Sequence, residues 1–164
     1  DKQEKAYLLN YFLESFRGTL FRQTMFAEFE QKAHEMAATG ESLTSQSLCS
    51  IYKKLNEDYF GPDTVTDPEI QYEWERIPHF YTPFYVYQYA TGFSAAIAIS
   101  RKIFNGEPGI LEGYRKFLSG GCCDTPIELL KLAGVDMSHT GPVEEALKFF
   151  EELLNEFEEL VHRF

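Results

Sequence analysis

The sequence lacks long apolar runs, clusters of basic residues and a cysteine framework, and each absence excludes a class of protein. No apolar run reaches the roughly 18 residues of a membrane span and no signal peptide opens the chain, so we expect no membrane partner. Acidic residues outnumber basic ones 26 to 15, and the net charge of −11 argues against a nucleic-acid partner. The three cysteines, Cys49, Cys122 and Cys123, form no disulfide pattern and favour a reduced, cytoplasmic setting.

Strand signals are also nearly absent, because apolar and polar residues alternate over no sustained stretch. Helix signals are frequent instead, and the 164 residues suffice for one domain with its own core. The pattern predicts an all-α chain of about seven helices, in a multi-helix array. The expected helices cover residues 5–38, 44–60, 67–77, 82–105, 109–119, 125–134, and a last segment from about 142 to the end.

The predicted helix ends depend on capping residues and on glycine or proline. Gly40 should end the first helix, and Thr44 should cap the second. The pairs Asp67-Pro68, Thr82-Pro83 and Thr125-Pro126 each place a capping side chain before a proline at the first helical position. The last helix should bury one side, made of Ala146, Phe149, Phe150, Leu153, Phe157, Leu160 and Phe164.

No set of metal ligands is visible in the sequence. The run H-E-M-A-A at residues 34–38 begins like the zinc motif H-E-x-x-H, in which two histidines four residues apart on a helix bind the metal. Ala38 stands where the second histidine should be, so His34 and Glu35 are interpreted as ordinary surface residues. The adjacent Cys122 and Cys123 are interpreted as loop residues, with a reactive vicinal thiol pair as the alternative.

The most unusual stretch places four tyrosines and one histidine between His79 and Tyr89. Pro78 and Pro83 bracket an irregular segment, which could present His79 and Tyr81 to a cleft. If a helix follows directly, Tyr85 and Tyr89 share one face and Tyr87 points to the opposite side. Some of these tyrosines could instead be packing residues with satisfied hydroxyls.

Several long blocks of the chain, in order, carry a resemblance to a known family. They are Y-L-L-N-Y-F-L-E-S-F-R-G-T-L-F-R-Q-T-M-F-A-E-F-E, E-W-E-R-I-P-H-F-Y, F-Y-V-Y-Q-Y-A-T-G-F-S-A-A and P-I-E-L-L-K-L-A-G-V-D-M. Together they resemble the oligoendopeptidase F group of the thimet-oligopeptidase-like (M3) zinc metallopeptidases. The likeness covers nearly the whole chain.

The resemblance implies a helical fold that encloses a deep channel and a zinc ion held by H-E-x-x-H and a later glutamate. This chain contains none of those ligands and begins D-K-Q-E-K without an initiator Met, so residues 1–164 are expected to be one fragment, the second half of such a catalytic domain. Zinc is then a cofactor of the full-length enzyme and not of the isolated fragment. That fragment should be inactive, and it should self-associate because it exposes apolar surface.

The resemblance also implies roles for the aromatic stretch in hydrolysing oligopeptide substrates. His79 is expected to contact the substrate backbone or the developing oxyanion, with hydroxyl groups from Tyr81, Tyr85 and Tyr87 beside it. The family's Y-Y-G-Y run matches residues 84–87 here, which assigns the catalytic hydroxyl to Tyr87, whereas helical phase favours Tyr85. Both remain candidates, and a stand-alone helical peptide-binding module remains the alternative function.

Overall fold

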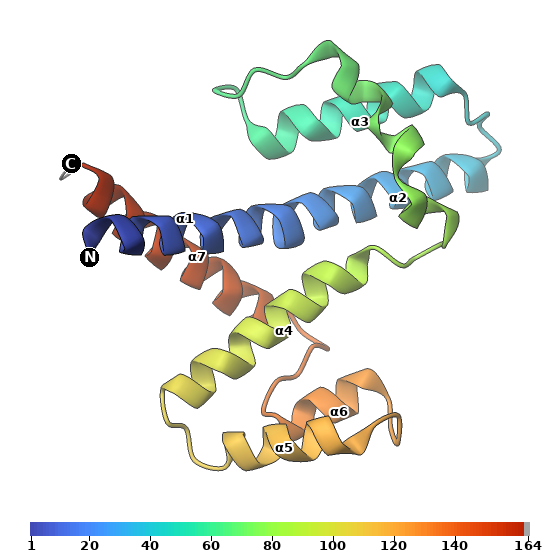
Figure 1. Cartoon of the computed structure of the whole chain (residues 1–164). Coiled ribbons are helices and arrows are strands. Elements are labelled where there is room, and N and C mark those ends of the chain that lie inside the picture. Colours follow the sequence, from blue (N-terminus) through green and yellow to red (C-terminus); the bar gives the residue numbers. More distant parts are fainter. Residues whose placement is uncertain (163–164) are drawn as a thin grey trace. The chain divides into compact units, whose positions relative to one another are not determined.

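The computed structural model describes residues 1–162 and is helical, with no strand, within that range (Figure 1). This confirms the predicted all-α class. The seven α-helices are α1 (Lys2–Phe16), α2 (Arg22–Thr39), α3 (Ser45–Phe60), α4 (Tyr87–Phe104), α5 (Ile110–Gly120), α6 (Pro126–Leu132) and α7 (Gly141–Val161). A π-helical turn (Arg17–Phe21) joins α1 to α2, and two 3₁₀ helices (Pro68–Arg76 and Pro78–Tyr81) lie between α3 and α4.

Several helix ends lie where the capping residues predict them. Gly40 ends α2 in the left-handed conformation, at φ 82°, which glycine adopts without steric cost. Thr44 and Thr125 each accept a hydrogen bond from a backbone N–H in the first turn of α3 and α6. Phe164, predicted to lie on the buried side of the last helix, is outside the described residues.

Three predicted α-helices differ from the structure. The one predicted over residues 5–38 is interrupted by the π-helical turn Arg17–Phe21, which separates α1 from α2. The segment from Pro68 to Arg76 forms a 3₁₀ helix rather than an α-helix. Helix α4 begins at Tyr87 and not near Thr82 as predicted. Thr82 is extended, as a residue before proline usually is, and Phe84 has φ 59°, which a right-handed helix does not accommodate. Tyr85 therefore precedes α4 and does not lie on it.

The chain forms two compact units, one made of Asp1–Leu20 with Thr91–Phe164 and the other of Phe21–Ala90. In the first unit α1 packs against α7, and the fully buried ring of Phe16 lies at the centre of this contact. Its centroid is 4.9 Å from that of Phe93 and 5.4 Å from that of Phe150. Such aromatic pairs stabilise a core beyond the area that they bury.

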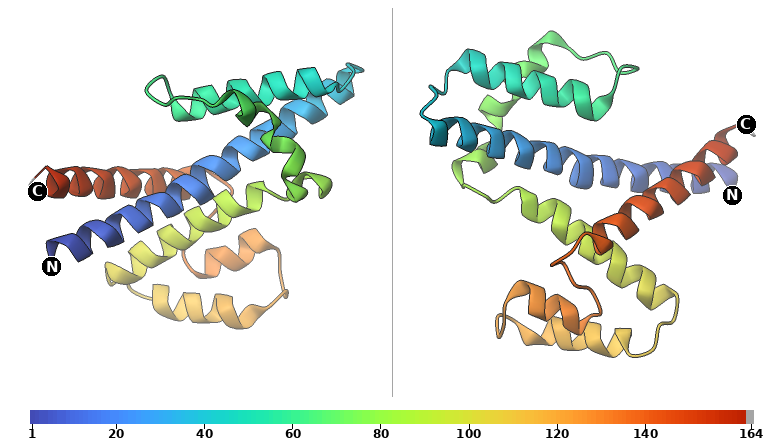
Figure 2. Two further views of the ribbon diagram at one scale, coloured as in Figure 1. Left: turned by 45° about the horizontal axis from the view of Figure 1, so that its top comes forward. Right: turned by 180° about the vertical axis from the view of Figure 1, so that it is seen from behind.

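Helices α5 and α6 of the same unit lie side by side (Figure 2). Their close approach requires Gly113, because a Cβ at this position would lie 2.0 Å from the carbonyl oxygen of Leu132. A second small core joins α4 to the segment after α6; its buried members are Ala95, Ala98, Ile99, Ala133 and Val135.

The second unit is built on α2 and α3, which pack against each other, and on the 3₁₀ helix Pro68–Arg76, which packs against α3. Apolar side chains from these elements and from the segment before α4 form its core. The buried members are Met25, Phe26, Phe29, Tyr52, Leu55, Ile77 and Val86.

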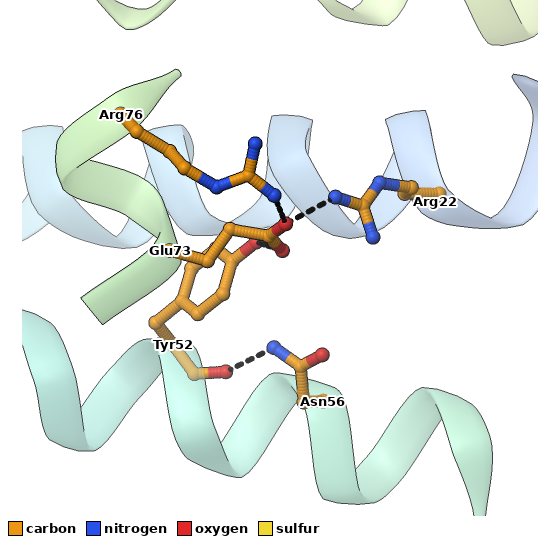
Figure 3. A network of polar contacts seen from close by, with 5 residues as sticks. All are labelled: Arg22, Tyr52, Asn56, Glu73 and Arg76. Carbon is orange, nitrogen blue, oxygen red and sulfur yellow. Dashed lines mark hydrogen bonds and ion pairs between the residues drawn. The ribbon is translucent and has the colours of Figure 1, made fainter. Parts of the chain in front are cut away.

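A buried carboxylate links three elements of the second unit (Figure 3). One oxygen of Glu73 accepts hydrogen bonds from Arg22 of α2, at 2.5 Å, and from Arg76. The other oxygen accepts from the Tyr52 hydroxyl of α3 at 2.6 Å, while Asn56 donates to the Tyr52 carbonyl. Burial by itself would raise the pKa of Glu73, but the hydrogen bonds from Tyr52 and Arg22 outweigh it, so the pKa lies below its ordinary value.

Replacing Tyr52 with Phe should destabilise the chain by about 1–3 kcal/mol, because a buried carboxylate oxygen loses its donor. The matched control is Tyr59→Phe, which removes a hydrogen bond from the same helix to the more exposed Glu28. This control should cost less than about 1 kcal/mol, since water can replace the lost donor. Urea unfolding followed by circular dichroism measures both changes, and equal costs would contradict a special role for the Glu73 network.

Candidate functional site

His79 is held between two anchored neighbours. Ile77 is buried in the core of the second unit, and the Phe80 ring packs against Phe26 and Phe29, with centroids 5.7 Å and 5.2 Å away. Pro78 begins the 3₁₀ turn that carries His79, whose side chain stays partly exposed. The position of the imidazole is therefore determined by the packing on either side of it.

Tyr85 and Tyr89 surround the His79 ring, and all three lie in the second unit. The Tyr85 ring stacks on the imidazole with centroids 5.8 Å apart and planes 11° apart, and the Tyr89 ring meets it edge-on at 5.6 Å. His79 Nε2 lies 3.2 Å from the Tyr89 hydroxyl, which in turn donates to the Tyr85 hydroxyl over 3.4 Å, a long hydrogen bond. We call His79, Tyr85 and Tyr89 the aromatic triad.

The triad forms a directed chain of hydrogen bonds. In the tautomer that carries the proton on Nε2, His79 donates to Tyr89 and Tyr89 donates to Tyr85. The Tyr85 proton is then available to an external acceptor, from a side chain that is 38% exposed. The hydrogen bond with Tyr85 raises the pKa of Tyr89, so Tyr89 stays protonated at neutral pH. The arrangement can donate hydrogen bonds to an oxygen without itself carrying charge.

The other two predicted tyrosines occupy different positions. Tyr81 closes the 3₁₀ turn and is 83% exposed, whereas Tyr87 is the first residue of α4 and is 50% exposed. The structure therefore brings His79 together with Tyr85. It also adds Tyr89, which the sequence indicated through its four-residue spacing from Tyr85 but which was not among the predicted site residues.

The turn before Tyr85 is strained. Phe84 has φ 59°, a left-handed conformation that costs an L-residue with a bulky side chain about 1–2 kcal/mol. Such strain persists where surrounding contacts enforce it, and it is common at functional sites. The sequence T-P-F-Y contains no glycine or asparagine to indicate a left-handed residue, so the turn could not be predicted from residue type.

The described residues do not fit a zinc site. Within residues 1–162 no group of three or more His, Cys, Asp and Glu side chains could hold a metal ion. His34, which begins the H-E-M-A-A run, is exposed and stacks on the Phe84 ring at 4.7 Å, while Glu35 accepts a hydrogen bond from Gln31. Both residues thus have partners within the chain.

The remaining candidates from the sequence are the three cysteines, all of which are free. Cys49 is buried and accepts a hydrogen bond from the Trp74 indole, and Cys122 and Cys123 are exposed and form no disulfide. Among the helices of residues 1–162, none has both the length and the apolar character needed to cross a bilayer.

Comparison with known proteins supplies the context for this site. The model of peptidase family M3 matches residues 1–149. The chain is 53% identical to oligopeptidase PepF of Bacillus subtilis over 98% of its own length and 24% of that relative. It is 51% identical to the chromosomal oligoendopeptidase F of Lactococcus lactis subsp. cremoris, covering 99% of this chain and 27% of the relative.

Solved structures agree with the sequence comparison. The crystal structure of oligoendopeptidase-F from Enterococcus faecium superposes with a TM-score of 0.97 at 51% identity, over 100% of this chain and 32% of that one. A putative peptidase from Chlamydophila abortus gives a TM-score of 0.90 at 42% identity. The chain spans about a quarter of the length of the curated relatives named above. A family model that matches most of the chain, together with a shared fold at this identity, shows that the chain belongs to peptidase family M3.

Proposed function

We propose that this chain is part of the catalytic domain of a zinc-dependent oligoendopeptidase, and that it supplies a wall that binds the substrate and the transition state. The names of the relatives, oligopeptidase and oligoendopeptidase F, support hydrolysis of peptide bonds in short peptides. The observation that carries the proposal is the aromatic triad, three hydrogen-bonded side chains held in fixed geometry within a chain of this family.

The chemistry of the triad suits peptide hydrolysis. When a nucleophile adds to a peptide carbonyl, negative charge develops on the oxygen, and a prearranged donor lowers the barrier by about 3–4 kcal/mol. Tyr85 can supply such a donor, because the hydrogen-bond chain from His79 through Tyr89 leaves the Tyr85 proton available. In the other tautomer Nε2 accepts from Tyr89, and His79 itself can donate through the proton on Nδ1. Tyr87 remains a second candidate donor through its match to the family's run of tyrosines, and the exposed Tyr81 a candidate for contact with the substrate backbone.

No step of this proposal uses a metal held by the chain itself, because the described residues do not fit a zinc site. The zinc that the family resemblance implies would be held by residues outside these 164, and the isolated chain would then be inactive. The three free cysteines support a cytoplasmic enzyme, where thiols stay reduced. The net charge of −11 supports a peptide rather than a nucleic acid as the partner.

The isolated chain should self-associate. Helix α1 exposes the neighbouring side chains of Tyr7, Leu8 and Tyr11, which are 69%, 62% and 66% exposed. Grouped apolar surface of this kind favours association in water. Sedimentation velocity should show an average mass that rises with concentration, and Leu8→Glu with Tyr11→Glu should reduce the effect. A single monomeric species over a wide concentration range would contradict it.

His79→Ala in the enzyme that contains this chain should lower kcat/KM by about 100-fold or more, which is the scale for loss of one oxyanion donor. The melting temperature and the zinc content should change little, because His79 is partly exposed and belongs to no metal-ligand group. His162→Ala, at an exposed position after α7, is the matched control and should keep full activity. Near-normal peptidase activity of His79→Ala, or loss only through unfolding, would refute the site.

Tyr85→Phe and Tyr87→Phe should each lower kcat/KM by about tenfold or more, since each removes one hydroxyl donor. Because Tyr85 shares a hydrogen-bond chain with His79, Tyr85→Phe should add little to His79→Ala. Steady-state kinetics of the single and double variants measures this coupling. Full additivity for Tyr85 would contradict the triad as one functional unit.

A further inference from the structure

Tyr85 lies between two residues that the rest of the second unit holds in place. Val86, directly after it, is fully buried in the core with Phe26 and Phe29. Phe84, directly before it, is 60% exposed and so cannot be held by burial. What holds Phe84 in its left-handed conformation therefore decides where the Tyr85 ring lies.

Two side chains of α2 contact Phe84. The Glu30 carboxylate accepts a hydrogen bond from the Phe84 backbone N–H at 2.7 Å, although the two residues are 54 positions apart in the sequence. The His34 ring stacks on the Phe84 ring with centroids 4.7 Å apart. Because Glu30 and His34 are separated by four residues, they share one face of α2 and reach the turn together.

Glu30 is a carboxylate at a buried position of α2, with 7% of its surface exposed, where an apolar side chain is usual. Burying a carboxylate is unfavourable unless hydrogen bonds compensate, and an apolar side chain would pack here at lower cost. The carboxylate of Glu30 is the acceptor of the hydrogen bond with Phe84, and hydrogen bonds to carboxylates are stronger than those between neutral groups. Because the donor is the backbone N–H of the strained Phe84, stabilisation of this turn explains why a carboxylate is buried here.

We propose that Glu30 is a positioning residue for the candidate active site: by holding the Phe84 N–H it maintains the left-handed turn that stacks Tyr85 on His79. The placement of the ring follows from the geometry of this chain, whereas its effect on catalysis rests on the function proposed above. Glu30 itself touches neither His79 nor substrate in this proposal.

The placement is tested directly by the environment of the His79 ring. In enzyme carrying isotope-labelled histidine, with the His79 resonance assigned by its loss in His79→Gln, the stacked Tyr85 ring shifts the imidazole Hε1 signal. Glu30→Ala should move this signal toward its position in Tyr85→Ala. Glu30→Gln, which keeps an oxygen acceptor for the Phe84 N–H, should leave it nearly unchanged. Glu35→Ala, an exposed neighbour on α2 bonded to Gln31, is the control and should also leave it unchanged.

The effect on catalysis is tested by kinetics of the same variants. Glu30→Ala should lower kcat/KM by about tenfold, mostly through kcat, and Glu30→Gln should stay within about threefold of the parent enzyme. In a Tyr85→Phe background, Glu30→Ala should cost little more, because the hydroxyl that it positions is already missing.

The outcomes separate this inference from the proposed function. An unmoved His79 signal in Glu30→Ala overturns the positioning role, whatever the activity. A moved signal with unchanged kcat/KM supports the placement but refutes the catalytic use of Tyr85, and so the proposed function of the triad. Loss of activity in Glu30→Ala that adds fully to Tyr85→Phe shows a general structural role and overturns the inference.

Discussion

The buried carboxylate of Glu73 is the interaction on which the second unit depends. It takes hydrogen bonds from α2 through Arg22 and from α3 through Tyr52, and it belongs to the 3₁₀ helix that leads to His79. A 3₁₀ helix of nine residues is weak by itself, because its hydrogen bonds have poor geometry. Fixing it to two long helices through one charge defines the path of the chain just before the aromatic triad.

A second buried carboxylate acts just after that point. Glu30 of α2 holds the turn at Phe84. The segment with His79 is therefore anchored by a carboxylate on each side: at Glu73, which precedes it, and at Phe84, which follows it and is bound by Glu30. Along this segment, Ile77 and Val86 are buried while Tyr81 and Phe84 are exposed. The segment thus combines fixed ends with side chains open to solvent, which suits a site that binds a ligand rather than a packed core.

Much of the fold could be predicted because its signals are local. Gly40 and Thr44 act within one helical turn of the ends that they define, and the sequence pattern is enough to locate them. The start of α4 could not be predicted, because Thr82-Pro83 is a valid helix start, whereas the contacts on the left-handed turn at Phe84 come from Glu30 and His34, far away in the sequence. The same limit applies to the site. Composition and resemblance point to His79 and Tyr85, but their stacking depends on that turn. The spacing of Tyr89 from Tyr85 is visible in the sequence, but its hydrogen bonds to both residues are not.

The concentration of tyrosines around His79 has a physical explanation in this arrangement. A phenol packs like a large apolar ring and still carries one hydroxyl, so Tyr85 and Tyr89 hold the imidazole by ring contacts and connect to it by hydrogen bonds at the same time. Leucine would supply the packing without a donor, and a charged side chain would supply a donor at a larger desolvation cost. Since Tyr89 donates to Tyr85, the proton left over at the end of the chain is that of Tyr85, the residue whose position Glu30 controls. The strained Phe84 therefore directly precedes Tyr85, the residue whose hydroxyl must point toward the acceptor. At this position a costly backbone conformation helps to orient the donor.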